Sequence, residues 1–248
     1  MTALPPANQT IRQIWNTALD LLFPPRCVGC KRQGAWLCAR CRAQAPPLPE
    51  PLCVHCGQSI TSGDLCLDCQ NRPLALHGLR SAHLFEGPLC SAIYAFKYNG
   101  LRQMAGPLGE MLFAGYTRFA IAADLMVPVP LHAARQSQRG FNQSLLLAQD
   151  LAGRVHLPVD GKHLVRLRNT RPQVGLGATA RRTNVDGAFA WAGESLGGQR
   201  ALLIDDVCTT GATLESCADA LYTAGAASVW GLTLVRERRE DIDSAPEC

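Results

Sequence analysis

Hydrophobic residues follow two alternating patterns between residues 76 and 240. Short continuous apolar runs are typical of strands buried on both faces of a sheet, whereas apolar residues at every third or fourth position are typical of amphipathic helices. The runs predict strands at Leu79–Phe85, Leu125–Val129, His163–Leu167, Ala201–Ile204 and Ser228–Val235. The helical pattern occurs near Leu89–Tyr98, Met104–Phe119, Phe141–Leu151 and Thr213–Ala224. This alternation predicts an α/β domain with a mostly parallel sheet flanked by helices.

Residues 1–75 lack this alternation. A short helix is predicted around Ile11–Leu22, and the segment Ala45–Leu52 is too rich in proline for a helix or a central strand. Residues 26–75 contain too few large apolar side chains to build a hydrophobic core. We therefore divide the chain into an N-terminal helical segment (1–25), a small module (26–75) and the α/β domain (76–240).

The small module contains four CxxC pairs. They are Cys27 and Cys30, Cys38 and Cys41, Cys53 and Cys56, and Cys66 and Cys69. Two thiolates in such a tight turn can bind one tetrahedral cation, and a second turn completes the shell around zinc. Seven residues separate the first two pairs and nine separate the last two. Each segment is long enough for a short hairpin, so we favour sequential over interleaved pairing. The module is thus predicted to be a double zinc ribbon that holds two structural zinc ions and that zinc folds.

Two other readings of the cysteines stay open but are less favoured. A redox dithiol needs only one CxxC next to a βαβ pattern, and iron–sulfur clusters usually have a different spacing. Gly29, Gly34, Gly57 and Gly63 lie where turns around sulfur need positive φ or close backbone approach. The module is basic, yet its only aromatic residue of the Trp, Tyr or Phe type is Trp36, which favours a folding module over a nucleic-acid platform.

Composition narrows the class of protein further. Apolar residues make up 47% and charged residues 18% of the chain, which excludes a disordered protein. The longest uncharged run, Ala220–Val235, is shorter than the roughly 20 residues of a membrane span, and the N-terminus lacks the pattern of a signal peptide. We expect a cytoplasmic protein without membrane insertion. The net charge of +4 suits phosphorylated ligands but does not by itself indicate nucleic-acid binding.

A second motif follows the predicted strand Ala201–Ile204. Asp205 and Asp206 end the strand, and a turn of small and hydroxylic residues leads into the helix from Thr213. Strand, tight turn and helix direct free backbone N–H groups and the positive end of a helix dipole into one concavity, which suits a phosphate monoester. Acids beside an anion would repel it unless they accept hydrogen bonds from sugar hydroxyls. The motif therefore predicts a sugar-phosphate site, with binding contacts from Asp205, Asp206, Val207, Cys208, Thr209, Thr210, Gly211 and Thr213.

This motif, LLIDDVCTTGAT, resembles the signature loop of type I phosphoribosyltransferases, which bind 5-phosphoribosyl-1-pyrophosphate (PRPP). The resemblance implies that the two acids hold the ribose hydroxyls and that the loop wraps the 5′-phosphate. Together with FKYNG at 96–100, VPVPLH at 127–132, RGFNQS at 139–144 and the cysteine module, the chain resembles the ComF family of competence-associated, phosphoribosyltransferase-like proteins. That family combines a double zinc ribbon with a type I phosphoribosyltransferase fold.

The resemblance also implies roles for basic residues. Lys97, next to Tyr98, would meet the pyrophosphate of PRPP, and Arg135 and Arg139 would flank the turn into the helix Phe141–Leu151 and add anion contacts. The segment Asn169–Asn184 would be the loop that closes over the active site. Its candidates for neutralising pyrophosphate are Arg171, Arg181 and Arg182.

The implied chemistry is displacement at the anomeric carbon, with Mg²⁺ held mostly by oxygens of PRPP. Asp205, Asp206, Lys97 and Arg181 are the predicted catalytic residues. No dedicated nucleophile is needed, and Cys208 is interpreted as a packing residue.

Two functional hypotheses follow from the resemblance. In the first, the chain transfers phosphoribosyl to an unknown nitrogenous acceptor, in DNA uptake or in nucleotide salvage. In the second, it is a non-catalytic PRPP sensor or a factor that binds single-stranded DNA or DNA-uptake proteins. We favour the enzyme because the sugar-phosphate motif is intact and aromatic residues are only 6% of the chain. Whether the chain forms a homodimer stays open.

Overall fold

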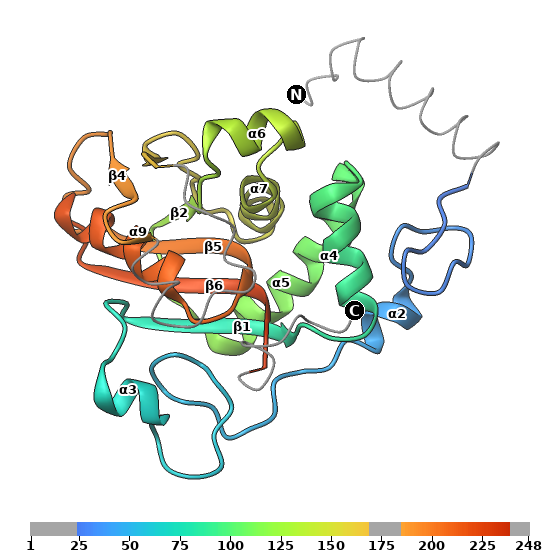
Figure 1. Ribbon diagram of the computed structural model, residues 1–248, viewed down its shortest axis with the longest axis horizontal. Coiled ribbons are helices and arrows are strands. Elements are labelled where there is room, and N and C mark those ends of the chain that lie inside the picture. The colour runs from blue at the N-terminus through green and yellow to red at the C-terminus, as the bar shows by residue number, and fades with distance from the viewer. Residues whose placement is uncertain (1–23, 169–184, 239–248) are drawn as a thin grey trace, which may run out of the picture.

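The computed structural model describes residues 24–168 and 185–238 (Figure 1). The predicted helix Ile11–Leu22, the predicted closing loop Asn169–Asn184 and the residues after 238 lie outside the described part. Among the described helices, none combines the length and the apolar composition that crossing a bilayer requires.

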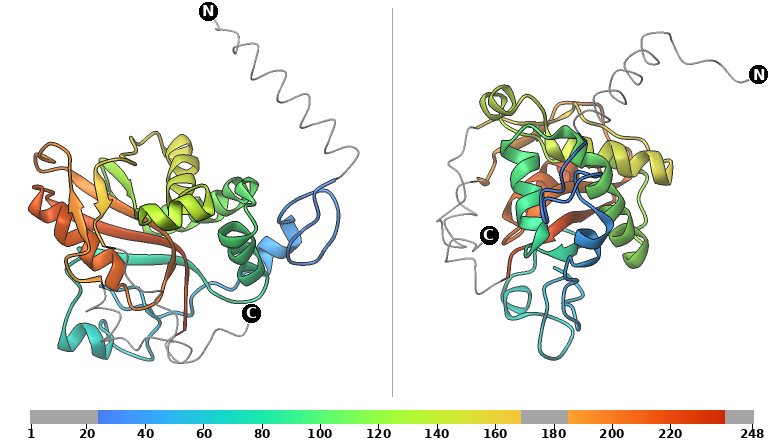
Figure 2. Two further views of the ribbon diagram at one scale, coloured as in Figure 1. Left: turned by 45° about the horizontal axis from the view of Figure 1, so that its top comes forward. Right: turned by 90° about the vertical axis from the view of Figure 1, so that its right-hand side faces the viewer.

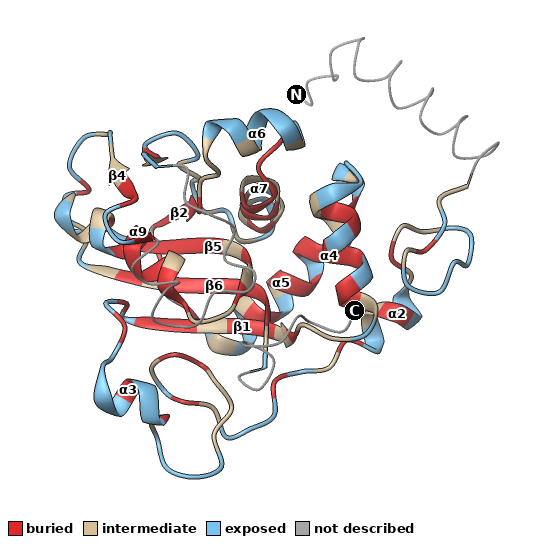
Figure 3. Ribbon diagram, viewed as in Figure 1, coloured by how far each residue is buried: buried red, intermediate tan, exposed pale blue. Residues whose placement is uncertain are grey.

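A four-stranded parallel sheet forms the centre of the α/β domain. Its strands are β1 (Gly78–Leu84), β2 (Leu125–Pro128), β5 (Arg200–Cys208) and β6 (Ser228–Arg236), in the order β1-β6-β5-β2. The two central strands are buried on both faces, as their continuous apolar runs require (Figure 3). The predicted parallel sheet flanked by helices is therefore confirmed.

Helices cover both faces of this sheet. One face carries α4 (Pro88–Tyr98), the 3-10 turn Arg102–Met104, α5 (Ala105–Phe119) and α7 (Gln143–Val155); the other carries α9 (Ala212–Thr223). Successive residues of a strand point to opposite faces, so Leu202 and Ile204 join the core under α4, α5 and α7. Leu203 instead joins the core under α9. The end of β5 is thus held between two packed layers.

The strand predicted at His163–Leu167 exists, but its predicted place in the main sheet is wrong. The strand β3 (Leu164–Arg166) pairs antiparallel with β4 (Phe189–Trp191) in a separate two-stranded sheet. Only Leu164 in β3 is buried, so a local hairpin satisfies the apolar side chain without a place in the main sheet. The sequence pattern also missed α6 (Ala133–Arg139), because this helix has no buried residue and therefore no apolar face to detect.

The two cysteine-rich modules pack against opposite faces of the sheet. The first ribbon, residues 26–44, contains the bridge Arg26↔Gln33 and α2 (Ala39–Ala43), and its buried residues join the core beside α4. The second ribbon, residues 51–72, contains the bridge Leu52↔Ser59 and α3 (Leu67–Asn71), and its buried residues join the core beside α9. Figures 1 and 2 show the first ribbon, which includes α2, next to α4, and the second ribbon along the edge strand β1. Both ribbons thus extend the cores of the α/β domain.

Candidate functional site

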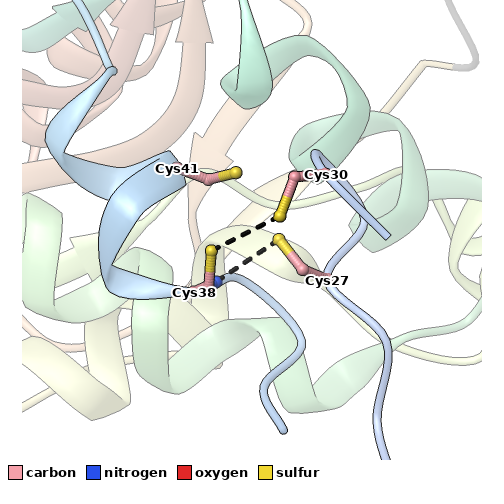
Figure 4. A group of neighbouring side chains, drawn as sticks. All are labelled: Cys27, Cys30, Cys38 and Cys41. Carbon is pink, nitrogen blue, oxygen red and sulfur yellow. Dashed lines mark hydrogen bonds between the residues drawn. The ribbon is translucent and has the colours of Figure 1, made fainter. Parts of the chain in front are cut away.

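Each ribbon brings four cysteine sulfur atoms together. Cys27, Cys30, Cys38 and Cys41 form one group (Figure 4), and Cys53, Cys56, Cys66 and Cys69 form the other. Within each group the four sulfur atoms lie within 4.8 Å of one another. The Sγ–Sγ distance is 3.6 Å both for Cys30 and Cys38 and for Cys56 and Cys66. A tetrahedron with zinc–sulfur bonds of about 2.3 Å has edges of about 3.8 Å. Both groups therefore fit a structural zinc ion, and the sequential pairing is confirmed.

Glycines give the cysteine turns the backbone freedom that the sequence predicted. Gly34, Gly57 and Gly63 have φ values of +107°, +69° and +78°. Gly29 acts through space instead, because a Cβ atom there would lie 3.0 Å from the sulfur of Cys41.

The two tetrads differ in their surroundings. All four cysteines of the second tetrad are buried, whereas Cys30 of the first is exposed. Two arginines border the second tetrad: Arg236 Nη2 donates to Cys56 O at 2.6 Å, and Arg80 Nη2 donates to Val54 O at 2.8 Å. Four thiolates around one Zn²⁺ would leave a net charge of −2, which these guanidinium groups would stabilise.

A cavity of about 250 Å³ lies at the carboxyl end of β5. The end of β5, the turn Thr209–Gly211 and the start of α9 form one side of this cavity. The residue before α9 is Gly211 at φ +82°, which has no side chain to cap the helix. Thr210 Oγ1 accepts a long hydrogen bond of 3.4 Å from the Ala212 amide. The start of α9 and the positive end of its helix dipole therefore lie at the cavity, as an anion site requires.

Two carboxylates with different partners stand at this edge. Asp205 Oδ1 accepts from Ser144 Oγ at 2.8 Å and from the Asp206 amide at 2.9 Å. Asp206 forms an ion pair with Lys97 Nζ at 3.0 Å, and its side chain is 3% exposed. Within the described chain, Asp206 Oδ2 is buried without a hydrogen-bond partner. Burial, and then the charge of Asp206, raises the pKa of Asp205 to about 7.

Basic side chains surround the acids. Arg135 and Arg139 lie on α6, ahead of the turn into α7, and Arg166 lies on β3. The Arg139 guanidinium donates to Gln143 Oε1 and lies 5.5 Å from the centre of the Tyr98 ring. Burial, and then the neighbouring charge of Arg135, lowers the pKa of the Arg166 guanidinium. This concentration of positive charge suits a ligand with several phosphoryl groups.

The cavity brings together most of the side chains that the sequence singled out. Those that line it are Lys97, Tyr98, Arg135, Arg139, Asp205, Asp206, Val207, Cys208, Thr209, Gly211 and Thr213. Thr210 is not among the lining residues, and Arg171, Arg181 and Arg182 lie outside the described part of the chain. Cys208 is 2% exposed and burial raises the pKa of its thiol, in keeping with a packing residue.

Some lining residues were not predicted. They are Val129, Pro130, Leu131, Gln143, Arg166, Ala212, Leu214 and Glu237. Five of them lie within the quoted motifs, so those motifs held a signal for them: Val129, Pro130 and Leu131 in VPVPLH, Gln143 in RGFNQS and Ala212 in LLIDDVCTTGAT. Arg166 had none beyond a locally basic stretch, because only the β3–β4 hairpin brings it to the cavity.

Comparisons with known proteins agree with this architecture. A family model described as a double zinc ribbon domain matches residues 18–70, and one described as a phosphoribosyl transferase domain matches residues 142–244. Among solved structures, glutamine PRPP amidotransferase from Bacillus subtilis is 22% identical with a TM-score of 0.36, over 52% of this chain and 25% of that one. The two family models and the observed parallel sheet together define the class of protein: a phosphoribosyltransferase-like α/β domain with an N-terminal double zinc ribbon.

Relatives of similar length identify its family. DNA utilization protein YhgH of Escherichia coli O157:H7 is 32% identical over 84% of this chain and 96% of the relative. Competence protein F of Haemophilus influenzae is 30% identical over 85% and 97%, and Competence protein ComFC of Bacillus subtilis is 30% identical over 81% and 84%. The chain belongs to the ComF family of competence proteins.

The geometry of the tetrads predicts two zinc ions per chain. Native mass spectrometry of the purified protein should find two, and Cys38→Ser and Cys69→Ser should each lose one, because each removes a ligand from a different tetrad. Cys90→Ser, which changes a buried cysteine outside both tetrads, should retain two. A wild-type protein with one zinc ion, none, or iron in their place would contradict the double ribbon.

The raised pKa of Asp205 predicts a pH-dependent effect of Asp205→Asn. An unfolded aspartate titrates at about pH 3.9. Since the folded pKa is about 7, the folded chain binds more protons than the unfolded chain between these values, and the contribution of Asp205 to stability falls as pH rises. The free energy of unfolding of the variant minus that of the wild type should therefore increase from pH 5 to pH 8 in denaturant titrations.

Both proteins are compared in the same excess of zinc, so that both tetrads are loaded at each pH. The control is Asp124→Asn at the opposite end of β5, where Arg200 lowers the pKa of Asp124 to about 2. Its difference from wild type should not change between the same two pH values, since Asp124 is ionised at both. A flat or falling difference for Asp205→Asn would contradict the raised pKa.

Proposed function

We propose that the cavity binds PRPP together with Mg²⁺ and that the protein transfers phosphoribosyl to a nitrogenous acceptor, releasing pyrophosphate. The observation that carries this proposal is the meeting of two carboxylates, the start of α9 and a group of basic side chains in one cavity. A bare phosphate would be repelled by Asp205 and Asp206. A sugar phosphate uses both halves of the site, because its hydroxyls donate to the acids while its phosphoryl group accepts from the amides.

The hydrogen bonds of the two acids support this proposal. Ser144 and the Asp206 amide hold one oxygen of Asp205, and Lys97 holds one oxygen of Asp206. The buried Oδ2 of Asp206, without a partner in the described chain, would gain one from a ribose hydroxyl or from a bound divalent cation. Mg²⁺ would supply neutralisation of the pyrophosphate and hold it for departure.

Lys97 has a second role in this proposal. An ammonium group has three donors, and the ion pair with Asp206 uses one direction of Nζ. The side chain is 19% exposed and lines the cavity, so it can also contact the leaving pyrophosphate. Arg135, Arg139 and Arg166 would stabilise the same departing charge. Catalysis would then rest on position and electrostatics, with no covalent intermediate on the protein.

Calorimetry with PRPP tests the acid pair. The wild type should bind PRPP in the presence of Mg²⁺, and the double variant Asp205→Asn, Asp206→Asn should bind at least about tenfold more weakly, because hydrogen bonds to charged groups contribute about 1.5–3 kcal/mol each. Asp124→Asn, at the opposite end of the same sheet, should bind as the wild type does.

Measurement of turnover distinguishes a phosphoribosyl-transferring enzyme from a non-catalytic PRPP sensor. Pyrophosphate release with a panel of nucleobases and amines would establish transfer, while PRPP binding without turnover across the panel would favour a PRPP sensor. Equal binding by the wild type and the double variant would overturn the assignment of the acids.

A second candidate function, binding of single-stranded DNA, is favoured by one surface feature. Tyr94 and Tyr98 on α4 are 60% and 65% exposed, and their ring centres lie 5.0 Å apart. Arg139 lies over Tyr98. Exposed rings beside a cation can stack bases and contact phosphates. The names of the relatives, DNA utilization protein and Competence protein, support a role with DNA.

Fluorescence anisotropy with a labelled oligonucleotide tests this candidate. Tyr94→Ala with Tyr98→Ala should weaken binding about tenfold or more, because base stacking contributes about 1–3 kcal/mol per base. Leu67→Ala, which removes an exposed apolar side chain of the second ribbon, should leave binding unchanged. Binding should fall steeply with salt and survive Asp205→Asn with Asp206→Asn. No effect of the tyrosine changes would exclude this surface.

A further inference from the structure

The second ribbon contacts the first turn of α9 through Glu215. This carboxylate is 8% exposed and forms an ion pair with Arg72, with Nη2 3.2 Å from Oε1. The Ala75 amide donates to Oε1 at 3.3 Å. A carboxylate in the first turn of a helix can accept hydrogen bonds from the amides of its own helix. Here Oε2 of Glu215 accepts from Arg72, and Oε1 accepts from the Ala75 amide, so both oxygens bind the segment that follows the second ribbon. The start of α9 is therefore tied to residues 72–75.

The same segment lies directly beneath the anion-binding turn. A Cβ atom on Gly211 would lie 3.1 Å from Leu74 Cδ1 and 3.2 Å from Leu79 Cδ2, so the bare Cα rests on both leucines. The ring of His55, which lies within the Cys53–Cys56 turn, hydrogen-bonds through Nε2 with Leu74 O at 2.9 Å. The carbonyl of His55 accepts from the Leu79 amide at 2.9 Å. His55 thus joins the metal-binding turn to both leucines that support Gly211.

A third connection runs along β6. Arg236 is 5% exposed, donates to Cys56 O and stands opposite Cys208 in the sheet. The next residue, Glu237, donates its amide to Cys208 O at 3.0 Å and lines the cavity. The end of β6 therefore contacts both the second tetrad and the end of β5.

The first ribbon offers a matched comparison. Its ion pair joins Arg42 to Glu110 of α5 at 2.9 Å, and a Cβ atom on Gly29 would meet Pro88 at the start of α4. None of residues 26–44 lines the cavity. The first ribbon packs on the opposite face of the sheet from α9.

We propose that the second ribbon is the positioning element of the anion-binding turn, with Glu215, Arg72 and Leu74 as its positioning residues. Zinc at Cys53, Cys56, Cys66 and Cys69 folds the ribbon, which holds residues 72–75 under Gly211 and against Glu215. Zinc in this tetrad and ligand in the cavity then stabilise each other, since coupling between two sites is reciprocal. The ligand half of this proposal rests on the proposed binding of PRPP; the positioning half does not.

Hydrogen exchange on the zinc-loaded, full-length protein tests the positioning half. Glu215→Ala should speed exchange of the amides in residues 209–215 about tenfold, because it removes hydrogen bonds to a buried charged group. Arg72→Ala should act in the same direction, more weakly because that side chain is 58% exposed. Arg42→Ala, which removes the equivalent ion pair of the first ribbon, should leave these amides unchanged. Equal exchange in Glu215→Ala and Arg42→Ala would overturn the proposal.

The sign of the effect on ligand affinity separates positioning from direct electrostatics. Removal of a negative charge near a bound anion would by itself tighten binding. Loss of positioning predicts the opposite, so Glu215→Ala should weaken PRPP binding in calorimetry about fivefold to tenfold, within the usual range of coupling between sites. Tighter binding would overturn the proposal. No binding of PRPP by the wild type would refute the proposed function, and the exchange result would still decide the positioning role.

The rate of zinc release tests whether ligand in the cavity stabilises zinc in the second tetrad. A zinc-selective chelating dye should remove zinc from the second tetrad at least about fivefold more slowly when PRPP and Mg²⁺ are saturating, and from the first tetrad at an unchanged rate. Cys38→Ser and Cys69→Ser each leave one tetrad and assign the two phases. Should Cys69→Ser fail to fold, Cys38→Ser still reports on the second tetrad alone. Protection should disappear in Glu215→Ala; protection of both tetrads alike, or of neither, would overturn the coupling.

Discussion

The ion pair between Lys97 and Asp206 is the interaction on which the arrangement of the cavity depends. A carboxylate that is almost fully buried at the end of a strand is costly unless a cation compensates it, and removal of one partner leaves the other charge stranded. Lys97 is the penultimate residue of α4, so the pair fixes the end of that helix over the end of β5. Asp205 is held from the other side by Ser144 on α7. Two helices are thus placed around the cavity by two adjacent carboxylates.

The zinc ribbons cover parts of the main sheet that its own helices leave open. A four-stranded parallel sheet has two edges, and the second ribbon lies along the edge strand β1, where the Leu79 amide donates to His55 O. Burial of both ribbons against opposite faces makes metal binding part of the stability of the α/β domain. The metal modules are therefore structural parts of the domain that holds the cavity.

Periodicity and spacing predicted the elements that have strong local patterns. The buried run at 201–204 predicted a strand with two covered faces, and the spacing of the CxxC pairs predicted two tetrads. Weak patterns failed for physical reasons. α6 has no buried face, and β3 is satisfied by a local hairpin with β4, whose three residues are too short for alternation to show. Arg166 could not be foreseen, since its position depends on that hairpin.

The sequence by itself determined the metal-binding groups, the parallel α/β architecture and the composition of the turn from Asp205 to Thr213, because these depend on residue types at short separation. Tertiary structure alone decided which partners meet. The pairs Lys97 with Asp206, Ser144 with Asp205 and Arg72 with Glu215 join residues separated by 109, 61 and 143 positions. Such contacts depend on the crossing of strands and helices in space, and local pattern carries no record of that geometry.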